Sequence, residues 1–127
     1  MDSRGMGTGR AGAKRIGNYG ETAARGYIEA KGYIVLAKSY KSPHGEIDII
    51  AMDGEYYVFI EVKYRRQLSF GRPAEAVSRR KQRNLIACAY TYLEEQGLSD
   101  VPCRFDIIEV FGREILEVNH IVNGFGE

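Results

Sequence analysis

Apolar and polar residues alternate along two neighbouring segments of the chain, and this period-two pattern is typical of β-strands. One segment reads GEIDII over residues 45–50, and the other reads VFIEVK over residues 58–63. β-Branched and aromatic residues dominate both segments. Asp53-Gly54 between them is a strong signal for a hairpin turn. The sequence therefore predicts two strands that pair as antiparallel neighbours.

The pattern in the rest of the chain predicts five further elements. They are a helix over about 21–31 with a capping box at Asn18 and Glu21, a strand over 33–41, a long helix capped by Ser78 and running to about Gln96, a strand over 103–110, and a last strand through 115–118 that frays at His120. The order is α-β-β-β-α-β-β. The second helix is long enough for a right-handed crossover between parallel strands. We therefore predict an α/β domain with a mixed central sheet of about five strands flanked by helices.

The first 16 residues differ in composition from the rest. Glycine and basic residues dominate there, and almost nothing apolar recurs. Such a segment cannot bury enough surface to offset its ordering entropy. We expect residues 1–16 to form a flexible basic arm and residues 17–127 to form a single domain, because 127 residues are enough for one core.

Composition narrows the class of protein. Apolar residues make up 44% and charged residues 28%, as in a globular protein. No apolar run approaches the ~20 residues that cross a bilayer, and the N-terminus does not resemble a signal peptide. We expect a cytoplasmic protein. Cys88 and Cys103 lack the spacing of a zinc site and are expected to be reduced, buried side chains.

The net charge of +1 conceals an uneven distribution. Between positions 63 and 83 the only acidic residue is Glu75, and the basic residues are Lys63, Arg65, Arg66, Arg72, Arg79, Arg80, Lys81 and Arg83. A local excess of this kind indicates that one face binds a polyanion. The alternative interpretation is a solvated helix face.

Three charged residues lie on the two central strands. By alternation Glu61 and Lys63 share a face, and pairing of the strands would bring Asp48 to the same patch, with Ile47, Ile49, Val58, Ile60 and Val62 on the other face. Two adjacent carboxylates repel each other unless a cation lies between them, and hard oxygen ligands suit Mg²⁺ or Mn²⁺. Alternatively, Asp48 and Lys63 form a simple cross-strand ion pair.

Asp48 followed by Glu61-Val62-Lys63 resembles the D…ExK core of the restriction-endonuclease-like, or PD-(D/E)xK, nuclease superfamily. The ordered strings GEIDII, VFIEVKYR, FGRPAEAV, RRKQR and RFDIIEV, with residues 17–21 before them, resemble the YraN-like family of uncharacterised bacterial proteins within that superfamily. The resemblance implies the three-layer restriction-endonuclease-like fold.

The resemblance also implies residue roles. Asp48 and Glu61 would hold Mg²⁺ or Mn²⁺ with the Val62 carbonyl as a third ligand, and Lys63 would position the attacking water or offset phosphate charge. Glu21 would add a ligand or hold a metal-bound water; its other interpretation is an acid that stabilises the first turn of its helix. A polar residue of the second helix, Lys81 or Gln82, would face the active site.

The function implied is a metal-dependent nuclease that hydrolyses phosphodiester bonds in DNA, selecting branched, flap or junction structure rather than base sequence. Phosphate contacts would come from Arg65, Arg66, Arg80, Lys81 and Arg83. Two other classes stay open: a nucleic-acid-binding module of the same fold without catalysis, and an interaction protein that uses its exposed aromatic residues. A homodimer is possible, because symmetric cutting of two strands needs two sites.

Overall fold

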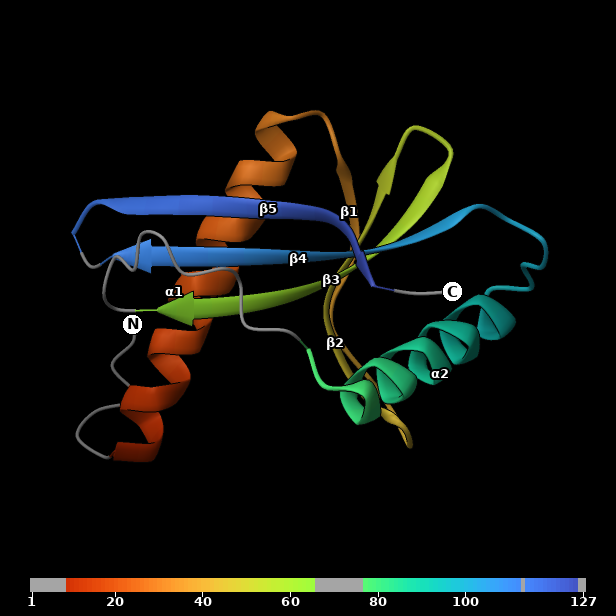
Figure 1. Ribbon diagram of the computed structural model, residues 1–127, viewed down its shortest axis with the longest axis horizontal. Coiled ribbons are helices and arrows are strands. Elements are labelled where there is room, and N and C mark those ends of the chain that lie inside the picture. Colours follow the sequence, from red (N-terminus) through yellow and green to blue (C-terminus); the bar gives the residue numbers. More distant parts are fainter. Residues whose placement is uncertain (1–8, 66–76, 113, 126–127) are drawn as a thin grey trace.

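The computed structural model describes residues 9–65, 77–112 and 114–125, with side chains from residue 19 onward. Its elements follow the predicted order (Figure 1). They are α1 (Gly9–Ala30), β1 (Ile34–Ser42), β2 (Gly45–Asp53), β3 (Tyr56–Arg65), α2 (Arg79–Glu95), β4 (Cys103–Gly112) and β5 (Leu116–Phe125). The predicted α/β class and element order are confirmed.

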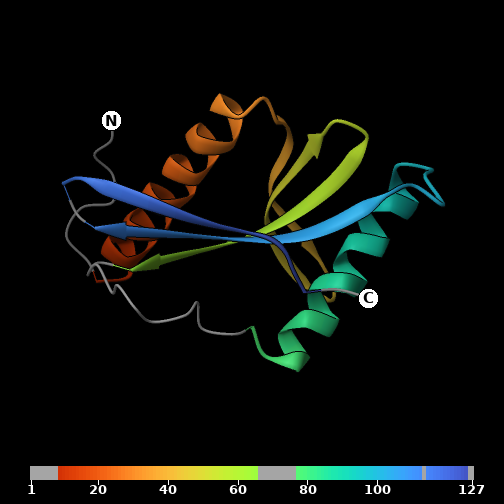
Figure 2. The ribbon, with the colours of Figure 1, turned by 45° about the horizontal axis from the view of Figure 1, so that its top comes forward.

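The five strands form one mixed sheet in the order β1-β2-β3-β4-β5. β3 and β4 are parallel and every other neighbouring pair is antiparallel. The crossover between the parallel strands contains α2, as predicted. The helices α1 and α2 lie on opposite sides of the sheet (Figure 2), and each covers its own apolar cluster. The sheet is therefore the middle of three layers.

Helix α2 is bounded as its sequence predicts. The Ser78 side chain accepts a hydrogen bond from the Lys81 backbone N–H at 3.1 Å, which caps the helix. Gly97 follows the C-terminal end with φ of 71°, a conformation that glycine adopts without strain. Leu85, Cys88, Ala89, Tyr92 and Leu93 form the buried stripe. This stripe fixes which side chains of the first turn point toward the sheet.

Helix α1 begins much earlier than predicted. It starts at Gly9, so its first turns lie within the segment expected to be a flexible arm. The capping-box spacing of Asn18 and Glu21 was misleading, because the same spacing occurs inside helices. Alanine, arginine and lysine over residues 10–15 favour a helix enough to extend it. The division into an arm over 1–16 and a domain from 17 stays a prediction, and residues 1–8 lie outside the described part of the chain.

The last strand is longer than predicted. β5 continues to Phe125, and His120 lies in its middle rather than at a frayed end. Residues Leu116 to Phe125 stay paired with β4, with one register shift between Phe105 and Ile107. The prediction of fraying was wrong because it relied on the apolar pattern alone. Pairing to a buried neighbour holds a polar strand equally well.

At one point along β1 and β2, the side chains switch from one face of the sheet to the other. Ile47 packs in the α2 cluster whereas Ile49 packs in the α1 cluster, although regular alternation would put both on one face. In the β1–β2 ladder, Ser39 and Asp48 lie between the same two pairs, and Ser39 has φ of 51°, which is unusual for a residue other than glycine. The predicted common face for Ile47 and Ile49 is therefore wrong. The exchange occurs beside Asp48.

The two cysteines are free thiols, as expected, but only Cys88 is fully buried. Its sulfur accepts a hydrogen bond from the Ser42 hydroxyl at 3.1 Å, and this contact joins α2 to the end of β1. Burial raises the pKa of the Cys88 thiol. Cys88 is therefore a packing residue.

Candidate metal and nucleic-acid site

The candidate site lies where β2 and β3 separate. Their ladder ends at the pair Ile49 and Ile60, so the next opposed residues are Asp48 and Glu61. Asp48 does not continue the ladder, because its Oδ2 accepts the backbone N–H of Val62 at 2.8 Å. Beyond this point β2 turns toward the first turn of α2 while β3 continues toward α1 (Figure 1). The two carboxylates therefore meet at a fork in the sheet.

Asp48 is in an unfavourable environment for a negative charge. Burial, followed by the charge of Glu61, raises the pKa of Asp48 to about 7. The charges of Glu21 and Glu46 act in the same direction, and only the Val62 N–H opposes them. These four acids, Glu21, Glu46, Asp48 and Glu61, are called the acidic fork below. A cation among them would favour the ionised form of Asp48.

Glu61 already has a cationic partner from the protein. Its side chain is 10% exposed, and Lys81 Nζ on α2 lies 3.2 Å from its Oε2. The Ser78 cap fixes the first turn of α2, and Lys81 extends from that turn to the fork. Of the two candidates on this helix, Lys81 is therefore the one that contacts the acidic fork.

Gln82, the other candidate, is turned toward the start of its own helix. Its amide Nε2 donates to the Val77 carbonyl at 2.8 Å. In this position Gln82 supports the first turn of α2, and no described contact joins it to a carboxylate of the fork. The predicted catalytic contact of Gln82 is therefore not part of this geometry.

Glu21 reaches the fork from α1, on the side of the sheet opposite Lys81. Burial and the charge of Glu46 raise the pKa of Glu21, whereas hydrogen bonding with Asp48 and the charge of Lys38 lower it. The helix α1 runs past this residue for several turns on both sides, so Glu21 is not a first-turn acid. The structure brings Glu21 beside Asp48, as one of its two predicted interpretations requires.

Lys63 follows Glu61 by two residues and shares its face of β3. The parallel register places Lys63 next to Glu109 of β4, which is 3% exposed. Glu109 accepts a hydrogen bond from Asn119 Nδ2 at 3.0 Å, and Arg65 Nη2 lies 4.0 Å from it. Charges of both signs therefore continue along this face of the sheet beyond Glu61.

The predicted phosphate-contacting residues fall into two groups. Arg80, Lys81 and Arg83 are exposed on the first turns of α2, beside the fork. Arg65 is half-buried at the end of β3, and Arg66 lies outside the described residues. The α2 group thus forms a basic flank on one side of the acidic fork.

The residues of the fork fit a hard divalent cation. Asp48 and Glu61 supply carboxylate oxygens, and the Val62 carbonyl belongs to the same stretch of β3; Mg²⁺ commonly binds to one or two carboxylates and keeps several waters. Among the described residues no group of three or more His, Cys, Asp or Glu side chains is arranged as a ready-made metal site. The fork therefore suits a two-carboxylate set better than a set that includes Glu21 as a third direct ligand.

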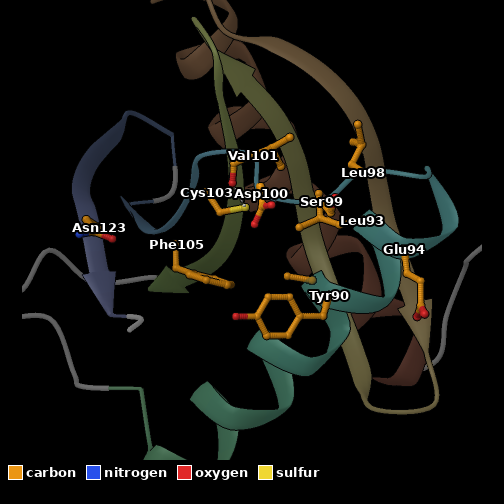
Figure 3. Close-up of a pocket in the computed structure, with 11 residues that line it drawn as sticks. Tyr90, Leu93, Glu94, Leu98, Ser99, Asp100, Val101, Cys103, Phe105 and Asn123 are labelled. Atoms are coloured by element: carbon orange, nitrogen blue, oxygen red, sulfur yellow. Dashed lines mark hydrogen bonds between the residues drawn. The ribbon is translucent and has the colours of Figure 1, made fainter.

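A wider depression of about 700 Å³ lies elsewhere, between the C-terminal half of α2 and the strands β4 and β5 (Figure 3). Its lining includes Tyr90, Leu93, Val101, Phe105 and Asn123. None of the predicted site residues lines it. The volume of a depression alone therefore does not identify the candidate functional site.

A second charged network joins β4 to β5. Arg104 Nη2 lies 2.9 Å from Asp106 Oδ2. His120 Nε2 contacts the same oxygen at 2.7 Å, while Lys31 Nζ lies 3.2 Å from His120 Nδ1. Because the lysine can only donate, His120 accepts at Nδ1 and donates from Nε2. The sequence signal for His120 was its polar position within a strand.

The fold and the acidic fork define an α/β domain whose mixed sheet separates at a pair of carboxylates. Within the described part of the chain, no helix combines the length and the apolar character needed to span a membrane. The model of the uncharacterised protein family UPF0102 matches residues 20–110, a range that includes the whole fork and Lys81. The chain belongs to this family, which confirms the resemblance to YraN-like proteins.

Relatives of similar length share the family name. A UPF0102 protein of Dehalococcoides mccartyi is 43% identical over 97 residues, covering 76% of this chain and 80% of the relative. One of Symbiobacterium thermophilum is 46% identical over 98 residues, covering 77% and 83%. One of Clostridioides difficile is 42% identical over 112 residues, covering 88% and 97%. The similarity thus extends over most of each relative.

Proposed function

We propose that this protein is a metal-dependent nuclease that hydrolyses phosphodiester bonds in DNA. The observation that carries the proposal is the meeting of Asp48 and Glu61 at the fork between β2 and β3, with the pKa of Asp48 raised to about 7 by burial and by neighbouring acids. Perturbed carboxyls of this kind concentrate at functional sites. Crowding of carboxylates in this way does not stabilise a sheet that has only a structural role.

In this proposal Asp48 and Glu61 hold Mg²⁺ or Mn²⁺, with the Val62 carbonyl as a third donor. The bound cation supplies Lewis acidity toward a phosphoryl oxygen and lowers the pKa of water that it binds. Glu21, next to Asp48, would bind water beside the ion rather than the ion itself. This assignment agrees with the finding that the described residues contain no group of three or more His, Cys, Asp or Glu side chains that could hold a metal ion.

Lys63 has a different role from the acids. It lies on the same face as Glu61, two residues further along β3. There its ammonium group orients the attacking water or offsets the negative charge that develops on the phosphate in the transition state. Arg80, Lys81 and Arg83 contact neighbouring phosphates from α2. Such contacts carry no base information, so we expect selection by DNA structure.

The decisive experiment is cleavage of labelled duplex, single-stranded, flap and four-way-junction DNA in the presence of Mg²⁺ or Mn²⁺. The variant Asp48→Asn keeps the shape of the side chain but loses its charge. Glu55→Gln is the matched control, because it removes one negative charge from an exposed position in the β2–β3 turn. We expect cutting by the parent and the control, and none by Asp48→Asn.

Cleavage that survives Asp48→Asn, or that persists with the metal chelated, would reject the proposal. The substrate that the parent cuts fastest identifies the DNA structure it selects. Binding of each DNA is measured in parallel with Ca²⁺ in place of Mg²⁺, so that a loss of cutting is not confused with a loss of affinity.

A second candidate function is a binding module of the same fold that does not cut. The observation that favours it is the Lys81–Glu61 ion pair at 3.2 Å, which neutralises one of the two carboxylates without a metal. A module of this kind would bind DNA in a salt-sensitive manner. Its binding would survive Asp48→Asn and would even tighten, because a negative charge is removed from the contact face.

A further inference from the structure

A second basic flank lies on the other side of the acidic fork. A depression of about 340 Å³ opens between α1 and β1, and it is lined by Glu21, Thr22, Arg25, Lys38 and Ser39. Glu21 belongs both to this depression and to the fork. The depression therefore adjoins the candidate metal site on the α1 side, whereas Lys81 reaches the fork from α2.

The backbone irregularity at Ser39 creates this arrangement. In a regular strand Lys38 and Tyr40 would share a face. Here Tyr40 packs in the α2 cluster and donates to Glu95 at 2.8 Å, whereas Lys38 turns to the α1 side, where its charge acts on Glu21. Ser39 between them has φ of 51° and, like Asp48, lies between the ladder pairs Lys38–Ile49 and Tyr40–Ile47. Strained backbone of this kind is often kept where function requires it.

The two cations of the depression retain donors for a ligand. Glu29 contacts Arg25 only at Nε, at 3.2 Å, so among the described residues the two terminal nitrogens of Arg25 have no acceptor. Lys38 is exposed at the mouth of the depression. Thr22 and Ser39 add two hydroxyl donors. Arginine, lysine and hydroxyl groups around a small open volume are suited to a phosphate group.

We propose that Arg25, Lys38, Thr22 and Ser39 form a subsite for a backbone phosphate of the nucleic acid next to the phosphate at the acidic fork. This subsite rests on the proposed function, and it adds a binding surface outside the residues that the motifs single out. A strand that crosses the fork meets four acids, which repel it. Arg80, Lys81 and Arg83 lie on one side of the fork, and Arg25 and Lys38 lie on the other. These cations attract the strand on both sides of the four acids and offset their repulsion.

The test uses the full-length chain with Lys38→Gln, Arg25→Gln and the double variant. Lys41→Gln is the matched control, because Lys41 is another exposed lysine of β1 that does not line the depression. Binding of a fluorescent single-stranded and a duplex oligonucleotide is measured at several salt concentrations, with Ca²⁺ present so that no cutting occurs. Thermal unfolding midpoints verify that each variant is folded.

We expect the double variant to reduce the slope of log affinity against log salt by roughly 0.7–0.9 units, since one phosphate contact is lost. Each single variant should remove about half of that, and Lys41→Gln should leave the slope unchanged. Equal losses for Lys38→Gln and Lys41→Gln would overturn the subsite, because the effect would then follow net charge and not position.

This binding test and the cleavage test of the proposed function together separate the subsite from the nuclease assignment. If the parent cuts DNA and the double variant keeps the full salt slope, the subsite is wrong and the nuclease stands. If the parent binds without cutting and the double variant loses slope, the subsite stands and the nuclease is wrong. If the parent neither cuts nor binds any of the duplex, single-stranded, flap and four-way-junction DNAs, both are wrong.

Discussion

Lys81 Nζ lies 3.2 Å from Glu61 Oε2, so the protein places its own cation beside a carboxylate that we assign to a metal. Lys81 is half-exposed, whereas Glu61 is almost fully buried. The lysine can therefore move into solvent or onto a phosphate when a divalent ion takes its place. In the proposed function, a bound metal and Lys81 would compete for one carboxylate.

This competition predicts that Lys81→Gln binds Mn²⁺ more tightly than the parent. A half-exposed ion pair contributes about 0.2–1 kcal/mol, so the gain should be roughly 1.4- to fivefold in affinity. Titration calorimetry with Mn²⁺ measures it directly. The same substitution should weaken DNA binding, because one phosphate contact is lost. Tighter DNA binding in Lys81→Gln would contradict the assignment.

The raised pKa of Asp48 predicts that the metal-free protein loses stability as the pH rises. An unfolded aspartate titrates near 3.8, whereas burial and neighbouring acids raise the pKa of Asp48 in the folded state to about 7. Between these values the folded state retains a proton that the unfolded state has released. The contribution is therefore fully present below about pH 4 and is lost as the pH approaches 7.

The size of this loss is on the order of 2–4 kcal/mol, from about 1.4 kcal/mol per pKa unit with allowance for relaxation. Asp48→Asn should abolish this part of the pH dependence and should be the more stable protein at pH 8 without metal. Urea unfolding at pH 5 and pH 8 tests this. Addition of Mn²⁺ at pH 8 should stabilise the parent and not the variant; equal stabilisation of both would place the metal elsewhere.

Sequence pattern predicted the element order because each element satisfies a local rule. The alternation in β2 and β3, the Ser78 cap and the glycine after α2 all act within a few residues. The errors have two causes. The extension of β5 past His120 depends on pairing with β4. The early start of α1 at Gly9 is itself local, but the capping-box spacing of Asn18 and Glu21 suggested a later start.

The sequence indicates which residues belong to the candidate site better than it indicates how they are arranged. Asp48 and Glu61 fall opposite each other through hairpin register, which a sequence can indicate. The exchange of faces at Ser39 depends on one backbone dihedral, to which a period-two pattern is insensitive. Lys81 and Gln82 are adjacent on a helix, and only packing of the buried stripe of α2 decides which of them faces the fork.

Lys63→Met tests the chemical step separately from metal binding. If the Lys63 ammonium acts in the transition state, the maximal cleavage rate should fall roughly 10²–10³-fold. Mn²⁺ affinity should be unchanged or slightly higher, because Lys63 is not a ligand. Single-turnover cleavage at saturating protein, alongside calorimetry, separates the two effects. A variant with an unchanged rate would remove Lys63 from the mechanism.

Asp106 supports the fold on the α1 side of the sheet, and its loss should affect stability rather than chemistry. Its side chain is fully buried and interacts with Arg104 and His120, while Oδ1 accepts the backbone N–H of Asn123 at 2.8 Å. Burial alone would raise the pKa of Asp106, but the hydrogen bonds from His120, Arg104 and the Asn123 backbone outweigh it and lower the pKa. The charged carboxylate is therefore the stabilising form.

Asp106→Ala should destabilise the protein by about 3–5 kcal/mol, because the donors on Arg104, His120 and the Asn123 backbone lose their buried acceptor. Arg104 retains its ion pair with Asp53 at 2.9 Å, which favours the lower end of that range. The parent should also lose this contribution as the pH falls from about 4 through the lowered folded pKa. Urea unfolding at pH 7 and at pH 3 measures both effects. Folded Asp106→Ala should bind Mn²⁺ with the affinity of the parent, since none of its contacts reaches the acidic fork; weaker binding would mean that this network also positions the site.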